Sequence, residues 1–175
     1  MVNKRQKIIA VMVAAVVIMA SLAFVLLSQK PEPTLAERMA INSSDINGTE
    51  WSYGHGLAPQ FHFTSNLSSY QYLSCFIDRI EIFLVLAVYN TSHDCMAVFN
   101  GYQSQSMQNL SIGQLGFVIN DTFQSHFIFL RDKVFVSLDA TMPSWEEGNL
   151  TTVYNAGLRA TEIQDAKIRA YYSDH

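Results

Sequence analysis

The chain has 175 residues, of which 49% are hydrophobic and 15% are charged, and this length is typical of one domain. Its net charge of −4 is unevenly placed, because residues 1–30 hold four Lys or Arg and no acid, whereas residues 31–175 hold seven Lys or Arg and fifteen Asp or Glu. Nucleic acid needs clustered Lys and Arg, so an acidic chain without a basic stripe excludes it as a partner.

The first predicted element is an apolar run at residues 8–28, IIAVMVAAVVIMASLAFVLLS, which contains no charge, Pro or Gly. As a helix it would span roughly 31 Å, close to the ~30 Å hydrocarbon core of a bilayer. Lys4, Arg5 and Lys7 precede the run, and positive residues stay on the cytoplasmic side. The sequence therefore predicts a cytoplasmic tail at 1–7, a transmembrane helix at 8–28 in contact with the lipid bilayer, and an external C-terminal part.

A cleaved signal peptide is the alternative interpretation of this run. Its apolar core would be about 7–15 residues long and would end in small residues. The run here is longer, and its A-x-A-like motif at 20–23 lies inside it. We therefore expect an uncleaved signal anchor, a single-pass protein of the cell membrane, a linker at 29–34 and an extracytoplasmic domain at 35–175.

Helices and strands are both predicted within residues 35–175. Thr34 and Glu37 match a capping box, which predicts a short helix at 35–41. Apolar alternation, turn residues and caps then predict the other elements. In chain order these are strands around 51–58, 59–65 and 77–89, a helix from 92 to about 103, a strand at 114–120, a hairpin of 123–130 and 134–139, and a closing helix that starts at the cap Asn149 or Thr151 and ends near 171. The mixture predicts an α+β fold, an antiparallel sheet with helices packed on one face.

Sequons for N-glycosylation are more frequent than chance predicts. Seven of the ten asparagines begin an N-x-S/T motif, where about one or two would be expected by chance. Asn, Ser and Thr are also common in turns and caps, which accounts for part of the excess. We expect a glycoprotein that carries glycan at several of these sites. The seven are Asn42, Asn47, Asn66, Asn90, Asn109, Asn120 and Asn149.

Cys75 and Cys95 are the two cysteines of the chain. An even number of cysteines in an oxidising compartment favours a disulfide bond. Zinc ligation is the alternative, but it usually involves a CxxC pair, which is missing here. A catalytic thiol is the third possibility, and no neighbouring residue marks either cysteine as activated. We therefore predict a disulfide between Cys75 and Cys95.

Four segments together resemble a known group of proteins. They are INSSDINGTEWS (41–52), LAVYNTSHDCMAVFNGY (86–102), SIGQLGFVIN (111–120) with FIFLRDKVFVSLDA (127–140), and the final helix. The group consists of small, mostly uncharacterised membrane-anchored extracytoplasmic α+β domains of prokaryotic envelopes, archaeal ones in particular. Related shapes occur in the extracytoplasmic sensor domains of bacterial Ser/Thr kinases and in photosystem-associated lumenal proteins.

The chain also departs from this group at two points. Gln114 stands where Asp is usual, and Asp132-Lys133 replace a turn that contains Gly. The resemblance implies a fold and a location, and it implies no catalytic residue.

No motif for a catalytic, cofactor or metal site is present in the sequence. The histidines, His55, His62, His93, His126 and His175, form no HExxH motif and no i, i+4 pair. His62 and His126 lie in predicted strands, where the polar face of a sheet is the ordinary interpretation and a metal site the alternative. A G-x-S-x-G elbow, a P-loop and a GxGxxG motif are all missing. We expect no cofactor, no metal and no enzyme activity.

Three functions are compatible with these observations. The leading hypothesis is a non-enzymatic domain that binds a surface protein partner or serves a structural role at the cell surface. The alternative is a small-ligand sensor or binding domain with a pocket lined by Phe61, Phe63 and Phe127. The third is a hydrolase that brings together His62, His126 and acidic groups from distant strands.

Overall fold

The computed structural model describes residues 16–21, 32–54, 66–102, 107–142 and 149–174. The chain forms two compact units, Met1–Glu32 and Pro33–His175. In the first unit, the described residues 16–21 are helical, and Ser21 Oγ donates a hydrogen bond to the carbonyl of Val17.

The predicted transmembrane helix is wrong on the evidence of the described residues. None of their helices is long and apolar enough to cross a membrane. The assignment to the cell membrane as a single-pass protein depended on this helix and is corrected with it.

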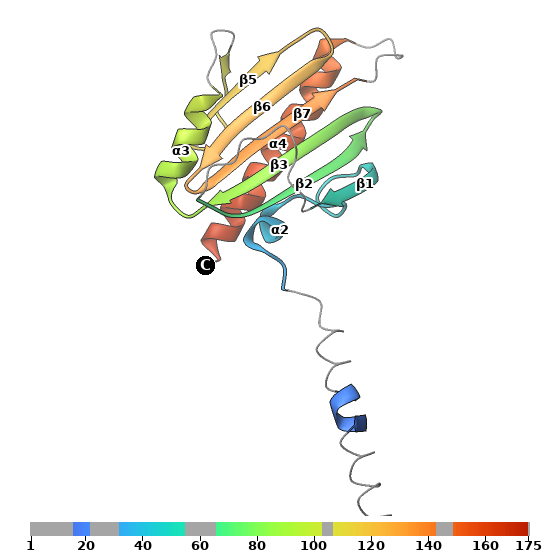
Figure 1. Cartoon of the computed structure of the whole chain (residues 1–175). Helices are drawn as coiled ribbons and strands as arrows, with labels where there is room; N and C mark the ends of the chain where they lie inside the picture. Colours follow the sequence, from blue (N-terminus) through green and yellow to red (C-terminus); the bar gives the residue numbers. More distant parts are fainter. Residues whose placement is uncertain (1–15, 22–31, 55–65, 103–106, 143–148, 175) are drawn as a thin grey trace, which may run out of the picture. The chain divides into compact units, whose positions relative to one another are not determined.

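The second unit is an α+β domain built on one antiparallel sheet. The strands follow the order β1-β2-β3-β7-β6-β5-β4, and all neighbours are antiparallel (Figure 1). The elements are α2 Leu35–Met39, β1 Thr49–Gly54, β2 Leu67–Ile77, β3 Ile80–Tyr89, α3 Ser92–Gly101, β4 Gln108–Asn109, β5 Leu115–Asn120, β6 Gln124–Arg131, β7 Val134–Thr141 and α4 Leu150–Ser173.

Helices cover both faces of the sheet, so the prediction of helices on one face is wrong. In Figure 1, α4 crosses the far face behind β3, β6 and β7. Successive side chains of a strand point to opposite faces. Accordingly, Phe127 and Phe129 of β6 share a buried cluster with α2 and α4, whereas Ile128 and Leu130 share another with Phe99 of α3. Helix α3 packs on the second cluster and shields it from solvent.

The β2–β3 hairpin differs from the predicted strand at 77–89. Ile77 pairs with Ile80, so Asp78 and Arg79 form a two-residue turn. Both have positive φ, 49° and 68°, as the type I′ turn of a tight hairpin requires. Gly or Asn would be the usual residues there, and their absence explains why the turn was not predicted.

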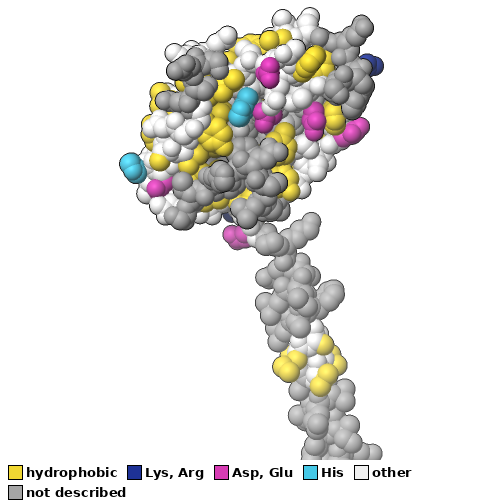
Figure 2. Space-filling view, turned by 45° about the horizontal axis from the view of Figure 1, so that its top comes forward, with side chains coloured by type: hydrophobic (Ala, Val, Ile, Leu, Met, Phe, Trp, Pro, Cys, Tyr) yellow, Lys and Arg dark blue, Asp and Glu magenta, His cyan; other side chains and the backbone are white. Residues whose placement is uncertain are grey.

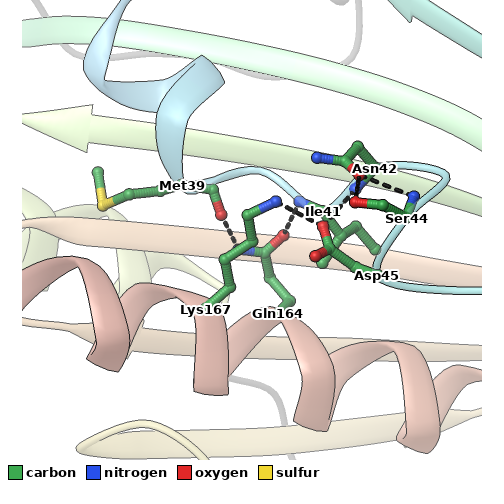
Figure 3. Close-up of polar contacts among 7 residues, drawn as sticks. All are labelled: Met39, Ile41, Asn42, Ser44, Asp45, Gln164 and Lys167. Carbon is green, nitrogen blue, oxygen red and sulfur yellow. Dashed lines mark hydrogen bonds and ion pairs between the residues drawn. The ribbon is translucent and has the colours of Figure 1, made fainter.

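A buried amide joins the end of α2 to α4. Gln164 of α4 is fully buried; its Oε1 accepts from the Ile41 N–H at 3.0 Å and its Nε2 donates to the Met39 carbonyl at 2.7 Å (Figure 3). One turn further along α4, Lys167 pairs with Asp45, which also accepts from the Asn42 N–H. These contacts fix the segment that follows α2 against the closing helix.

Candidate functional site

A cluster of polar side chains lies on the sheet face that carries α3. It consists of Gln124 and His126 of β6, Ser137 and Asp139 of β7, and Tyr102 at the C-terminus of α3. We call it the α3-face cluster. Figure 2 shows a histidine with acidic side chains nearby, set among hydrophobic side chains, on this side of the domain.

The strand register brings the members of the cluster together. His126 and Asp139 are direct partners across β6 and β7. His126 Nε2 lies 2.8 Å from Ser137 Oγ, and its Nδ1 lies 3.9 Å from Asp139 Oδ1. Gln124 Nε2 donates to the same Asp139 oxygen at 2.7 Å. A carboxylate on the Nδ1 side favours a proton on Nδ1, so the Ser137 hydroxyl donates to Nε2.

Burial sets the charge state of the histidine. The His126 side chain is 24% exposed. Its pKa is lowered from 6.5 because burial disfavours the imidazolium, and the negative charge of Asp139 opposes this effect only in part. The imidazole is therefore neutral at pH 7. The pKa of Tyr102 is raised, first by burial and then by the negative charge of Asp139.

Domain stability should fall as the pH drops below about 6.5. The pKa of His126 is lower in the folded state than its ordinary value of 6.5, so the unfolded chain binds more protons in this window and protonation favours unfolding. Urea unfolding midpoints at pH 7.5, 6.5 and 5.5 would measure the slope. In the His126→Gln variant, the contribution of His126 to this change of midpoint with pH should vanish. A variant whose midpoint changes with pH as much as that of the wild type would contradict the role given to His126.

The order Ser137, His126, Asp139 is also that of a hydrolase triad, in which serine attacks a carbonyl and backbone N–H groups bind the oxyanion. Ser137 is only 1% exposed, so its hydroxyl does not face a substrate. Strand β7 is paired with β3 on one side and β6 on the other over its whole length. Its N–H groups are therefore committed to the sheet and leave none to bind an oxyanion.

Asp139 differs from two other carboxylates of the domain in its partners. Asp165 is held by Arg131 through two hydrogen bonds of 2.7 and 3.1 Å, and Asp45 pairs with Lys167. Asp139 is 22% exposed, and its basic neighbour within 4 Å among the described residues is His126 alone. Because this imidazole is neutral, no described residue places a positive charge within 4 Å of the half-buried Asp139 carboxylate. Taking such a charge out of water without a counterion is costly.

The groups around Asp139 also attract positive charge. Helix α3 ends at the cap residue Tyr102, and no basic residue in its last turn offsets the partial negative charge of its C-terminus. The Tyr102 ring packs edge-on against His126, with centroids 6.3 Å apart, and against Phe135 at 5.3 Å. Aromatic faces bind cations. Within the described residues, no group of three or more His, Cys, Asp or Glu could hold a metal ion.

The predicted disulfide is wrong, because both cysteines are free. Cys75 of β2 belongs to the buried cluster beneath α2 and α4, whereas Cys95 of α3 belongs to the cluster on the opposite face. The sheet lies between them. Burial raises the pKa of Cys75 to about 11 and that of Cys95 to about 12, so neither is a reactive thiolate at neutral pH.

We expect both thiols to resist a disulfide reagent in the native protein. Each is 0% exposed, so reaction with Ellman's reagent at pH 8 should require unfolding. In guanidinium chloride without reductant, two thiols per chain should react. A native thiol that reacts within seconds, or a denatured chain without titratable thiols, would contradict the structure.

The sequons are dispersed over turns and element ends. The side chains of five of their asparagines are exposed, and those of Asn42 and Asn120 are half-buried. Some of these asparagines also have structural roles: Asn149 caps α4 through Oδ1, and Asn66 Nδ2 donates to Asp94. Glycosylation stays a prediction. The exposed five are Asn47, Asn66, Asn90, Asn109 and Asn149.

The other residues considered in the sequence analysis lie outside the α3-face cluster or outside the described residues. His62, Phe61 and Phe63 lie outside the described residues. Phe127 is fully buried in the cluster under α4. Asp139 was not singled out in the sequence, although it alternates with Ser137 on one face of the predicted strand at 134–139. The register that places it beside His126 was not readable from the sequence.

No protein-family model matches the chain, and no curated protein matches it. Among solved structures, the chain is similar to the extracellular domain of PknH from Mycobacterium tuberculosis, at 12% identity and a TM-score of 0.48 over 79% of this chain and 98% of that chain. A likeness at this level carries no conclusion about the present chain.

Proposed function

We propose that residues 33–175 form a non-catalytic binding domain for a small cationic ligand, such as an amine, at the α3-face cluster. The observation that carries the proposal is the half-buried carboxylate of Asp139, which has no Lys or Arg partner among the described residues. A bound ammonium group would supply the missing positive charge. Recognition of a surface protein partner stays a prediction.

Three features of the cluster favour a cation over other ligands. Asp139 supplies a full negative charge, the C-terminus of α3 supplies a partial one, and the Tyr102 ring supplies an aromatic surface. Gln124 and His126 hold the carboxylate side chain in place on the sheet. The buried Ser137 hydroxyl and the fully paired β7 strand support a binding role rather than acyl transfer.

The test is an NMR titration of the full chain with tetramethylammonium chloride at pH 7.5. We expect saturable shifts of the backbone amides of Tyr102, His126 and Asp139, and binding that weakens as salt concentration rises. tert-Butanol, a neutral compound of similar shape, and sodium acetate should cause no saturable shift at these positions.

Two substitutions make the test specific to the carboxylate. Asp139→Asn keeps the shape and removes the charge, and it should weaken binding at least about tenfold, as expected for losing a charge-assisted contact. Asp121→Asn alters an exposed carboxylate in the neighbouring β5–β6 turn and should leave binding unchanged. Equal binding by wild type and Asp139→Asn, or by the cation and tert-butanol, would refute the proposal.

A further inference from the structure

A pocket lies at the outer edge of the sheet, where β4 and β5 meet the first turn of α4. It has a volume of about 270 Å³ and is lined by Gln108, Asn120, Leu150, Thr151 and Tyr154. We call it the edge pocket. Asn120 lies on the same face of β5 as Val118, which packs in the cluster under α4. The edge pocket and the α3-face cluster are therefore on opposite faces of the sheet.

Two neighbouring buried polar atoms near the edge pocket have no hydrogen-bond partner among the described residues. They are Asn120 Oδ1, on a residue that lines the pocket, and Ser125 Oγ, on a residue that is 0% exposed. Asn120 and Ser125 are direct partners across β5 and β6, so their side chains lie next to each other on one face. Buried polar atoms are nearly always paired in folded proteins. Ser125 is fully buried and does not line the pocket, so a molecule bound there would meet the side-chain amide of Asn120 and not Ser125 Oγ.

The lining of the pocket indicates the chemistry of its ligand. Two amides, a hydroxyl, a phenol and an apolar side chain contribute hydrogen-bonding groups and hydrophobic surface, and none of the five side chains carries a charge at neutral pH. A charged ligand would find no counterion among them. The volume of about 270 Å³ far exceeds the roughly 30 Å³ of one water and lies just below the ~300–1,000 Å³ range of pockets for drug-sized ligands.

We propose that the edge pocket binds a small neutral polyhydroxylated molecule of about the size of a monosaccharide. The side-chain amide of Asn120 forms a hydrogen bond with a hydroxyl group of the ligand, Gln108 and Thr151 bind further polar groups, and the Tyr154 ring packs against the C–H face of the ligand. This site is independent of the proposed cation site, because it uses other residues on the other face of the sheet.

The experiment is an NMR titration of the full chain, produced without glycosylation, since Asn120 also begins a predicted sequon. The probes are D-glucose, N-acetyl-D-glucosamine and myo-inositol, with cationic D-glucosamine and anionic D-glucuronate as charged counterparts. We expect saturable shifts at Asn120, Thr151 and Tyr154 with at least one neutral probe, and weaker binding of the charged compound that matches it. Shifts with none of the neutral probes would overturn the proposal and leave the pocket as a site for ordered water only.

Substitutions then assign the binding to this pocket. Asn120→Ala and the exposed Thr151→Ala should each weaken binding by about threefold or more, whereas Asn155→Ala, on an exposed residue of α4 outside the pocket lining, should not change it. Thermal unfolding of each variant would show that it is folded. Undiminished binding in both pocket variants would also overturn the proposal. This outcome is independent of the tetramethylammonium titration, which tests the cation site at Asp139.

Discussion

Replacing Gln164 with Leu should lower the free energy of unfolding by about 2–6 kcal/mol, because each of two buried backbone groups would lose its partner at a cost of about 1–3 kcal/mol. The groups are the Ile41 N–H and the Met39 carbonyl, which the Gln164 amide binds at 3.0 and 2.7 Å. Met39 ends α2, and the last carbonyls of a helix have no partner within it. The Leu side chain fills similar space and supplies neither hydrogen bond.

Urea unfolding followed by circular dichroism measures this loss. Glu162→Leu provides the matched control, since Glu162 is exposed on the same helix and an exposed substitution usually changes stability by less than about 0.5 kcal/mol. A Gln164→Leu protein as stable as the Glu162→Leu protein would show that the amide does not hold the segment after α2.

Replacing Gly157 with Ala should destabilise the domain by about 1–3 kcal/mol, the usual cost of overpacking a core. Ala is the better helix former by about 1 kcal/mol, so propensity alone predicts the opposite sign. Packing should dominate, because a Cβ at this position would lie 2.3 Å from Phe127 Cε2 and 2.8 Å from the Ala140 Cβ. The Phe127 ring is fully buried and packs on Tyr154 with centroids 5.4 Å apart, so it cannot move away freely.

A double-mutant cycle isolates this clash. Phe127→Leu alone should destabilise the domain, and it should cost less in the Gly157→Ala background because the smaller side chain leaves room for the methyl group. Gly101→Ala is the control: Gly101 ends α3, and apart from its chain neighbours and its own helix backbone, a Cβ there would meet no described atom within 4 Å. Additive effects of Gly157→Ala and Phe127→Leu would contradict the proposed close contact between α4 and the sheet.

Much of the fold could be predicted from local signals in the sequence. The capping box at Thr34, the helix that begins at residue 92 and the closing helix are found where they were expected. The hairpin around Asp132 is also present, with β6 and β7 on either side. These features depend on a few neighbouring residues, which is why the sequence alone reveals them.

Strand β2 was not predicted, because its signal is weak in the sequence. Its residues LSSYQYLSCFI include three serines and a glutamine, and Gln71 is buried on the same face as Leu73 and Cys75. A partly polar strand followed by a turn without Gly or Asn resembles a loop. The second helical layer was also missed, because the sequence does not say which face of the sheet α3 covers.

The candidate site needed information that local patterns do not contain. His126 was considered, but its neighbours depend on the register between β6 and β7. A shift of one residue would move Asp139 to the other face of the sheet. The same limit applies to the cysteines, whose even number favoured a disulfide while the sheet keeps Cys75 and Cys95 on opposite sides.

The pairing of β3 with β7 at the centre of the sheet has a consequence for how the domain folds. Ile77 pairs with nearby Ile80 in one hairpin, whereas Val88 pairs with the distant Val134 across the centre. The β2–β3 and β6–β7 hairpins can therefore form early from neighbouring residues. The pairing of β3 with β7 forms later, because it closes the long loop of residues between these two strands. We expect the formation of the β3–β7 pairing to be the rate-limiting step of folding.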